Sequence, residues 1–192
     1  MAKKESTFIN MLLTLFMVTL VASAALGYIY ELTKGPIAAS KLAKQNNAIK
    51  QVVPDFDNKP GEESYKMGVD GDTLEFFPAK QNGELVGTAV STFTNKGFSG
   101  NFKIMVGFLP DGTIHNISVL EHKETPGLGD KMQKNKSEWS VQFNGKNPAD
   151  FELKVTKDGG DVDAITASTI TSRAFCDAVE RAYNAYMEGG KK

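Results

Sequence analysis

The stretch DAITASTITS, residues 163–172, is the part of the sequence that best predicts the fold around it. It consists mostly of small and hydroxylated residues, it contains no Lys or Arg, and a helical pattern follows it directly. In that pattern, apolar residues recur at helical spacing on one face: Phe175, Ala178, Val179, Ala182 and Tyr186. Residues 166–171 are therefore predicted to begin a helix, where unbonded N–H groups and the positive end of the dipole favour a phosphate.

Two interpretations of this helix start are open. Ser and Thr residues that precede a helix usually act as N-caps, and general frequencies favour that interpretation. In the other interpretation, the small side chains let a ligand approach the backbone, and the hydroxyl groups bind the ligand or bond to it. The residue types alone do not decide between a cap and a ligand site.

The order of residues in this stretch resembles the flavinylation motif of the FMN-binding domain family, which reads Asp-x-x-Ser/Thr-Gly-Ala-Thr. The motif's Asp corresponds to Asp163 and its hydroxyl residue to Thr166. Its last Thr, which carries FMN through a phosphoester bond in the family, corresponds to Thr169. Ala167 and Ser168 replace the usual Gly and Ala, so a positive φ at residue 167 would be strained. The resemblance implies covalent FMN on Thr169, with Thr166, Ala167 and Ser168 as further cofactor-binding residues.

A second informative segment is EHKETPGLGDK, residues 121–131. Taken alone, its Pro126-Gly127 pair predicts a tight turn, and His122 beside it is typical of a solvated histidine. The string HxETPGLG resembles the same family again, specifically the G subunits of Rnf electron-transport complexes. It is also similar to the related C subunits of sodium-pumping NADH:quinone oxidoreductases. In that family the loop approaches the flavin, which implies FMN contacts from Glu124, Thr125, Gly127 and Leu128. Trp139 and Phe143 occupy an aromatic segment that is more typical of core packing.

Residues 6–30 carry no charge and are flanked by charged residues on both sides. About 25 residues at 1.5 Å each can cross a hydrocarbon layer of roughly 30 Å. A cleaved signal peptide is the alternative, because Ala22-Ser23-Ala24 is similar to a cleavage site, but the apolar run continues beyond it. We therefore expect a retained membrane anchor, whose orientation the flanking lysines leave undecided.

The remaining sequence predicts an α+β chain in three parts. Residues 1–34 form the tail and a single transmembrane helix, which Gly35-Pro36 is expected to end. Residues 35–54 are predicted to form an amphipathic stalk helix. Residues 55–192 form the compact FMN-binding domain, with an antiparallel sheet and flanking helices. After a loop at 55–65, strands are expected at residues 74–77, 85–93, 102–109 and 113–120, the last two joined by an Asp111-Gly112 turn.

Composition excludes several functional classes. The 192-residue chain has a net charge of −1, which does not favour a nucleic-acid partner. A single cysteine, Cys176, and two histidines give neither a disulfide framework nor a metal-ligand set. We find no catalytic triad, P-loop or paired carboxylates, so the sequence predicts no self-contained catalytic site.

The resemblance implies a membrane-anchored electron-transfer subunit of an ion-translocating oxidoreductase. It would relay electrons through covalent FMN in an Rnf-type complex that couples ferredoxin oxidation and NAD⁺ reduction to Na⁺ or H⁺ translocation. The implied partners are the bilayer, other membrane, iron–sulfur and flavin subunits, and a flavin transferase that attaches FMN on the outer side of the cytoplasmic membrane. Two alternatives are a flavinylated extracytoplasmic reductase subunit and a membrane-tethered binding domain without flavin.

Overall fold

The computed structural model describes residues 7–69 and 71–189, which fall into two units divided between Ala43 and Lys44. Helix α1, Phe8–Val52, begins in the first unit and ends in the second. Among the described residues, α1 is the one helix that is long and apolar enough to cross a membrane, and no residue of its apolar window is buried. The predicted N-terminal apolar helix is therefore present, with the length and composition that a membrane span requires.

The predicted helix end at Gly35-Pro36 is wrong, because α1 continues through Pro36 to Val52. Proline in a helix interior loses one backbone hydrogen bond, at a cost of about 3 kcal/mol. Here the residue before the proline is Gly35, which has no Cβ to clash with the proline ring. The segment that follows is rich in Ala, Lys and Gln, which are good helix formers. The loss therefore remains local and the helix is not divided.

The second unit contains an antiparallel meander in the order β1-β2-β3-β4-β5. The strands are Tyr65–Val69, Asp72–Gln81, Glu84–Gly97, Gly100–Phe108 and Ile114–Glu121. Strands β2 to β5 confirm the four predicted strands, whereas the edge strand β1 was missed. Short 3-10 helices follow at Gly129–Met132, Glu138–Phe143 and Thr156–Asp158, and helix α2, Thr169–Gly189, closes the unit.

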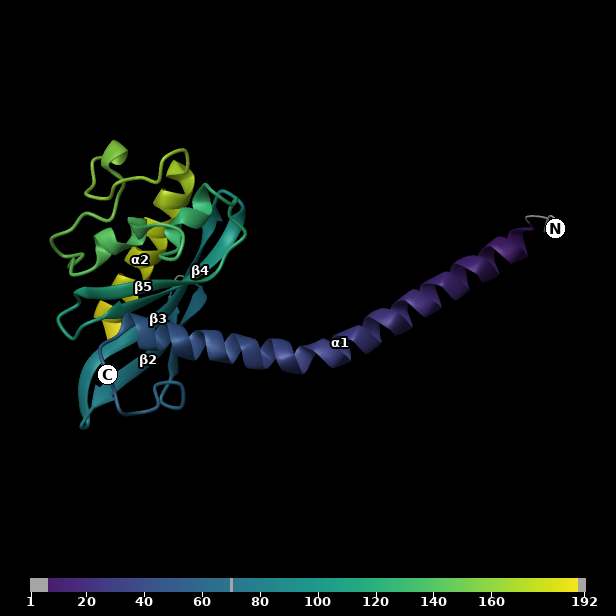
Figure 1. Ribbon diagram of the computed structural model, residues 1–192, viewed down its shortest axis with the longest axis horizontal. Coiled ribbons are helices and arrows are strands. Elements are labelled where there is room, and N and C mark those ends of the chain that lie inside the picture. Colours follow the sequence, from purple (N-terminus) through teal and green to yellow (C-terminus); the bar gives the residue numbers. More distant parts are fainter. Residues whose placement is uncertain (1–6, 70, 190–192) are drawn as a thin grey trace. The chain divides into compact units, whose positions relative to one another are not determined.

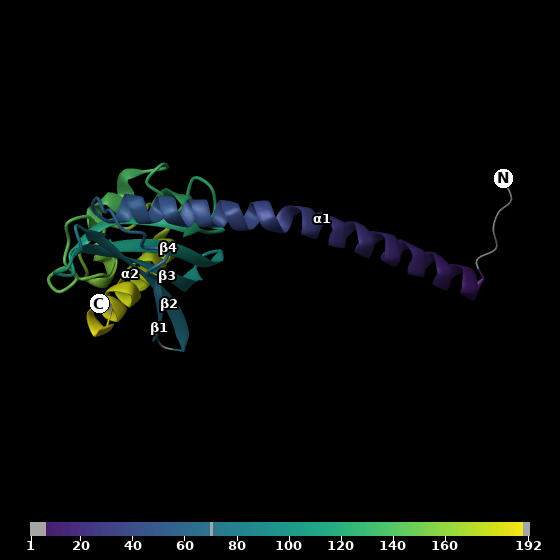
Figure 2. The ribbon, with the colours of Figure 1, turned by 90° about the horizontal axis from the view of Figure 1, so that it is seen from below.

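Side chains alternate between the two faces of a strand, so each face of the sheet packs into a core of its own. Phe76, Val90 and Ile104 point to one face and pack with α2. Their chain neighbours Phe77, Ala89 and Met105 pack on the other face with the end of α1 and the residue that follows it, through Ala48, Ile49, Val52 and Val53. Figures 1 and 2 show this layering, with the end of α1 and helix α2 on opposite faces of the sheet. The five apolar residues predicted to share one face of α2 are all buried.

The two cores predict how far the chain can be shortened. A variant that begins at Lys44 keeps the three α1 residues of the second core and Val53, and it is expected to fold. A variant that begins at Asp55, the predicted start of the domain, loses them and exposes Phe77 and Met105. The burial of each lost large side chain, Ile49, Val52 and Val53, contributes roughly 1.5 kcal/mol or more. The shorter variant should therefore be less stable by at least about 4 kcal/mol. Urea unfolding followed by circular dichroism measures the difference, and equal midpoints would contradict the assignment of these α1 turns to the domain core.

Candidate functional site

The start of α2 presents a cluster of hydrogen-bonding groups. The first backbone bond of the helix runs from Ser172 N–H to the Ser168 carbonyl at 3.0 Å. The N–H groups of residues 169–171 precede this bond and lie in the part of a helix that has no internal acceptor. Ser172 Oγ accepts from Ile165 N–H at 2.9 Å and donates to the Ser168 carbonyl at 3.0 Å, which fixes the entry of the chain into the helix. The predicted helix start is confirmed, and Thr169 is its first residue.

Ala167 adopts a left-handed backbone conformation with φ of +61°. Ser168 N–H donates to the Ile165 carbonyl at 2.9 Å, so this conformation belongs to a tight turn immediately before α2. The strain expected for alanine at this position is thus real, at a cost of about 1 kcal/mol relative to glycine. The turn leaves Ala167 exposed beside Thr169.

The Pro–Gly loop forms the tight turn that its sequence predicts. Leu128 N–H donates to the Thr125 carbonyl at 3.1 Å, and Gly127 between them has φ of +79°. Proline at the second position and a positive φ at the third define a type II turn. His122 Nδ1 accepts from Glu124 N–H at 3.1 Å, so this histidine supports the loop.

Glu124 is buried, and both of its carboxylate oxygens are engaged within the protein. Its Oε1 accepts from Ser99 N–H at 3.0 Å, in the connection between β3 and β4. Its Oε2 accepts from Thr171 Oγ1 at 2.8 Å, in the first turn of α2. The Glu124 side chain therefore joins the β3–β4 connection, the Pro–Gly loop and α2 at one point.

The start of α2 and the Pro–Gly loop, which are far apart in sequence, meet around one cavity of about 340 Å³. Six of the predicted cofactor-binding residues line it: Glu124, Thr125, Leu128, Ala167, Ser168 and Thr169. Thr166 and Gly127 belong to the same two segments but are not among the lining residues. Sequence reasoning missed Phe98 and Ile170, which also line the cavity.

An anion in this cavity would be bound by neutral hydrogen-bond donors, because no described cationic side chain lines it. Glu124 is the only ionisable group among the described residues that line it. Arg173, one turn along α2, is bound to Asp158 by hydrogen bonds of 2.6 and 2.7 Å. These hydrogen bonds lower the pKa of the Asp158 carboxyl group and raise that of Arg173. A phosphate in this cavity would therefore meet hydroxyl groups and helix N–H groups.

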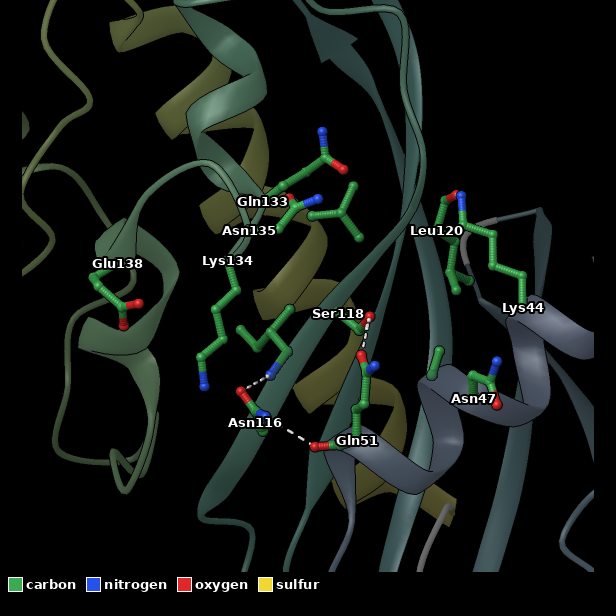
Figure 3. Close-up of a pocket in the computed structure, with 13 residues that line it drawn as sticks. Lys44, Asn47, Gln51, Asn116, Ser118, Leu120, Gln133, Lys134, Asn135 and Glu138 are labelled. Carbon is green, nitrogen blue, oxygen red and sulfur yellow. Dashed lines mark hydrogen bonds between the residues drawn. The ribbon is translucent and has the colours of Figure 1, made fainter.

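A larger cavity of about 740 Å³ lies elsewhere, between the end of α1, β5 and residues 133–138. Figure 3 shows polar side chains around it, including Asn47, Gln51, Gln133 and Asn135. Part of this set is bound internally, since Ser118 Oγ donates to Gln51 Oε1 at 3.2 Å. None of the predicted cofactor-binding residues lines this cavity. The smaller cavity is therefore the candidate site despite its size, because it unites the two motifs.

Other sequence predictions near the site concern packing. Phe143 is fully buried, and Trp139 packs edge-on against Phe143 and Phe175 with centroid distances of 5.5 and 5.1 Å. Phe143 therefore belongs to the core and the half-buried Trp139 packs against it, which agrees with the predicted packing role. Cys176 is buried, and burial raises the pKa of its thiol to about 12, which agrees with the predicted inert thiol. Asp163 has an exposed side chain, while its carbonyl accepts from Trp139 Nε1 at 2.5 Å.

These features define a domain that brings a hydroxyl-rich helix start and a Pro–Gly loop together, in a chain that begins with an apolar helix. The sequence model of the FMN-binding domain matches residues 97–184, a range that contains both segments. The class of protein is therefore that of FMN-binding domains.

Curated relatives narrow the class to a family. The G subunit of an ion-translocating oxidoreductase complex from Shewanella amazonensis is 35% identical over 84% of this chain and 80% of its own length. The protein of the same description from Erwinia tasmaniensis is 36% identical over 88% of the chain and 84% of its own length. The G subunit of the Na(+)-translocating ferredoxin:NAD(+) oxidoreductase complex from Acetobacterium woodii is 34% identical over 93% of the chain and 91% of its own length. The chain belongs to this family of complex G subunits.

Proposed function

We propose that this protein is a membrane-anchored flavoprotein subunit that relays electrons within an ion-translocating oxidoreductase complex. The observation that carries the proposal is the meeting of the two motif segments at one cavity whose lining includes the hydroxyl-bearing Thr169. Family membership supports it, because the relatives are described as subunits of such complexes. The apolar part of α1 would anchor the domain in the membrane.

FMN is proposed as the cofactor, attached to Thr169 through a phosphoester. In the attachment step, Thr169 Oγ1 would form a bond to the phosphorus of an activated FMN donor. The diphosphate bond of a flavin dinucleotide would break, the nucleoside monophosphate would leave, and the hydroxyl proton would pass to solvent. A separate flavin transferase would catalyse the step, and the exposed Asp163 side chain is available for its recognition.

The residues of the site fit such a group. The helix N–H groups of residues 169–171 suit a phosphate ester, and the turn at Ala167 keeps the approach to Thr169 open. When bound, FMN supplies the electron-carrying chemistry, while the protein supplies position and surroundings. Thr166, Ser168, Thr125 and Gly127 remain proposed as neighbours of the cofactor.

The complex is proposed to couple electron flow from ferredoxin to NAD⁺ with Na⁺ or H⁺ translocation, as the description of the Acetobacterium woodii relative states for that protein with Na⁺. The flavin domain would lie on the extracytoplasmic side of the cytoplasmic membrane. Iron–sulfur and flavin subunits would be its neighbours in the relay. The rival assignments are a flavinylated reductase that works alone and a tethered binding domain without flavin.

Intact mass of the denatured protein from its native host tests the proposal. The expected mass exceeds that of the polypeptide by one FMN less one water. An unmodified chain would favour the binding domain without flavin. Co-purification of the modified protein with several membrane subunits would distinguish the relay from the isolated reductase.

A further inference from the structure

Three exposed apolar side chains surround the candidate flavin cavity. Among the described residues of the second unit, four large hydrophobic side chains are exposed: Phe98 at 68%, Ile170 at 48%, Met187 at 43% and Leu128 at 40%. Phe98, Leu128 and Ile170 all line the cavity of Thr169, whereas Met187 does not. None of the three belongs to either core cluster. Exposed apolar groups that gather around one cavity indicate a binding surface more strongly than scattered ones do.

Each of the three residues comes from a different segment. Phe98 lies in the two-residue connection between β3 and β4, Leu128 ends the type II turn, and Ile170 follows Thr169 in α2. The apolar rim therefore exists only while these three segments keep their relative positions. Glu124 is the side chain that joins all three, through Ser99 N–H, its own loop and Thr171 Oγ1.

The space around Glu124 is closed on two sides by glycines. A Cβ added at Gly97 would lie 2.7 Å from Glu124 Oε1, and one added at Gly129 would lie 2.6 Å from Oε2. Glu124 and Thr171 are 4% and 1% exposed. A carboxylate this enclosed cannot easily change its partners, because every alternative leaves a buried polar group unpaired. The two hydrogen bonds of Glu124 therefore hold Ser99, and with it Phe98, next to the start of α2.

We infer that Phe98 covers the isoalloxazine ring of an FMN attached at Thr169, and that Glu124 is the positioning residue that holds Phe98 there. The inference rests on the proposed function. Leu128 and Ile170 contribute apolar contacts at the same rim. Aromatic side chains pack on flat ring systems in offset or edge-on arrangements, and an exposed phenylalanine beside the attachment site suits that role.

The size of the cavity favours a ring at its mouth. Small-molecule sites usually span about 300 to 1,000 Å³, and the 340 Å³ of this cavity is near the lower limit. A cofactor tied to the helix start therefore has only limited space inside. A ring at the mouth would fit between the apolar side chains Phe98, Leu128 and Ile170, where a neighbouring protein of the complex could approach it.

Phe98→Trp in the full-length protein, co-expressed with a flavin transferase, provides the direct test. An indole in contact with the flavin donates an electron to the excited ring and quenches its fluorescence. We expect the native variant to lose most of its flavin fluorescence, and denaturation to restore it. Met187→Trp is the matched control, another exposed apolar position of the same unit that does not line the cavity, and should keep the wild-type signal.

Two variants of Glu124 test its positioning role. In Glu124→Gln, the amide can accept from Ser99 N–H and donate to Thr171 Oγ1, so both links are retained. Glu124→Ala removes both and should increase iodide quenching of the attached flavin severalfold, as Phe98→Ala should. Thr171→Val removes only the α2 link without leaving a cavity, and it serves where Glu124→Ala does not fold. It should show an intermediate increase.

The outcomes separate the inference from the proposed function. If the wild type lacks the FMN mass despite the transferase, the proposed function fails and the ring contact fails with it. If the adduct forms but Phe98→Trp keeps wild-type fluorescence, the ring contact is wrong, and the rim is a surface for a partner protein of the complex. If Glu124→Ala and Thr171→Val carry flavin with wild-type iodide quenching, the positioning role is wrong.

Discussion

Thr169→Val is expected to abolish covalent flavin completely while the domain remains folded. Valine keeps the β-branched shape of threonine and removes the one oxygen through which the proposed ester forms. Thr169 is half-buried at the first position of α2, where loss of a hydroxyl costs about 1 kcal/mol or less. That cost is small beside the 5 to 15 kcal/mol, roughly, of a typical domain. Co-expression with a flavin transferase, followed by denaturation and peptide mass spectrometry, measures the adduct.

Neighbouring hydroxyl groups provide the controls. Thr169→Ser retains a hydroxyl and should keep partial flavinylation. Thr166→Val should keep the adduct, since Thr166 is exposed and does not line the cavity. Ser168→Ala should keep it as well, because Ser168 is buried beside the attachment position. A Thr169→Val protein that still carries FMN, together with loss in Ser168→Ala, would move the attachment site to residue 168.

The sequence could predict the two segments that meet at the candidate site, because both have strong local signals. A helix start with hydroxyl residues and a Pro-Gly turn are each fixed by backbone chemistry within a few residues. Their order along the chain matched one family, and the structure brings them to one cavity. For Ala167 the sequence indicated only that a positive φ would be strained, and the structure has a φ of +61° there.

Phe98 could not be predicted in the same way. Its importance depends on a contact between Ser99 and Glu124, 25 residues apart, and on the pairing of β3 with β4. An exposed aromatic residue in a glycine-rich connection has no local signature that separates it from an ordinary turn. Glu124 was predicted to contact the flavin, and its bonds within the protein became visible only once Thr171 and Ser99 were placed beside it.

Some features of the fold have a signal in the sequence but were not predicted. Asn82-Gly83 joins β2 to β3 with φ of 53° and 84°, the two-residue hairpin turn that an Asn-Gly pair favours. Strand β1 is five residues long and contains Gly68, which weakens any strand signal. The role of the last turns of α1 was harder to predict, because loosely spaced apolar residues do not show which face of a sheet they cover.

Gly107→Ala is expected to give a large loss of stability. Gly107 lies in β4, and a Cβ added there would fall 1.7 Å from the carbonyl oxygen and 2.4 Å from the carbonyl carbon of Val52. Both are backbone atoms at the end of α1, so no side-chain rotation can relieve the overlap. The last turn of α1 must lift from the sheet, and its contacts are then lost or strained.

The contacts at risk explain the size of the expected effect. His115 Nδ1 bonds to the Val52 carbonyl at 3.0 Å, and Asn116 Nδ2 donates to the Gln51 carbonyl at 2.8 Å. Overpacking of a filled core costs about 1 to 3 kcal/mol, and a backbone overlap belongs at or above the upper end. At roughly 2 to 4 °C per kcal/mol for a chain of this size, the melting temperature should fall by about 10 °C.

Gly68→Ala is the matched control for this substitution. Gly68 also lies in a strand, but the nearest atom to its added Cβ is the Asp72 carbonyl oxygen at 3.8 Å, which is ordinary contact. The control should therefore leave the melting temperature within a few degrees of the wild type or raise it slightly, since alanine restricts the unfolded chain. Thermal unfolding followed at the far-ultraviolet helix signal compares the two. Equal melting temperatures for Gly107→Ala and Gly68→Ala would contradict the close packing of the end of α1 on β4. The second core would then depend on its apolar side chains alone.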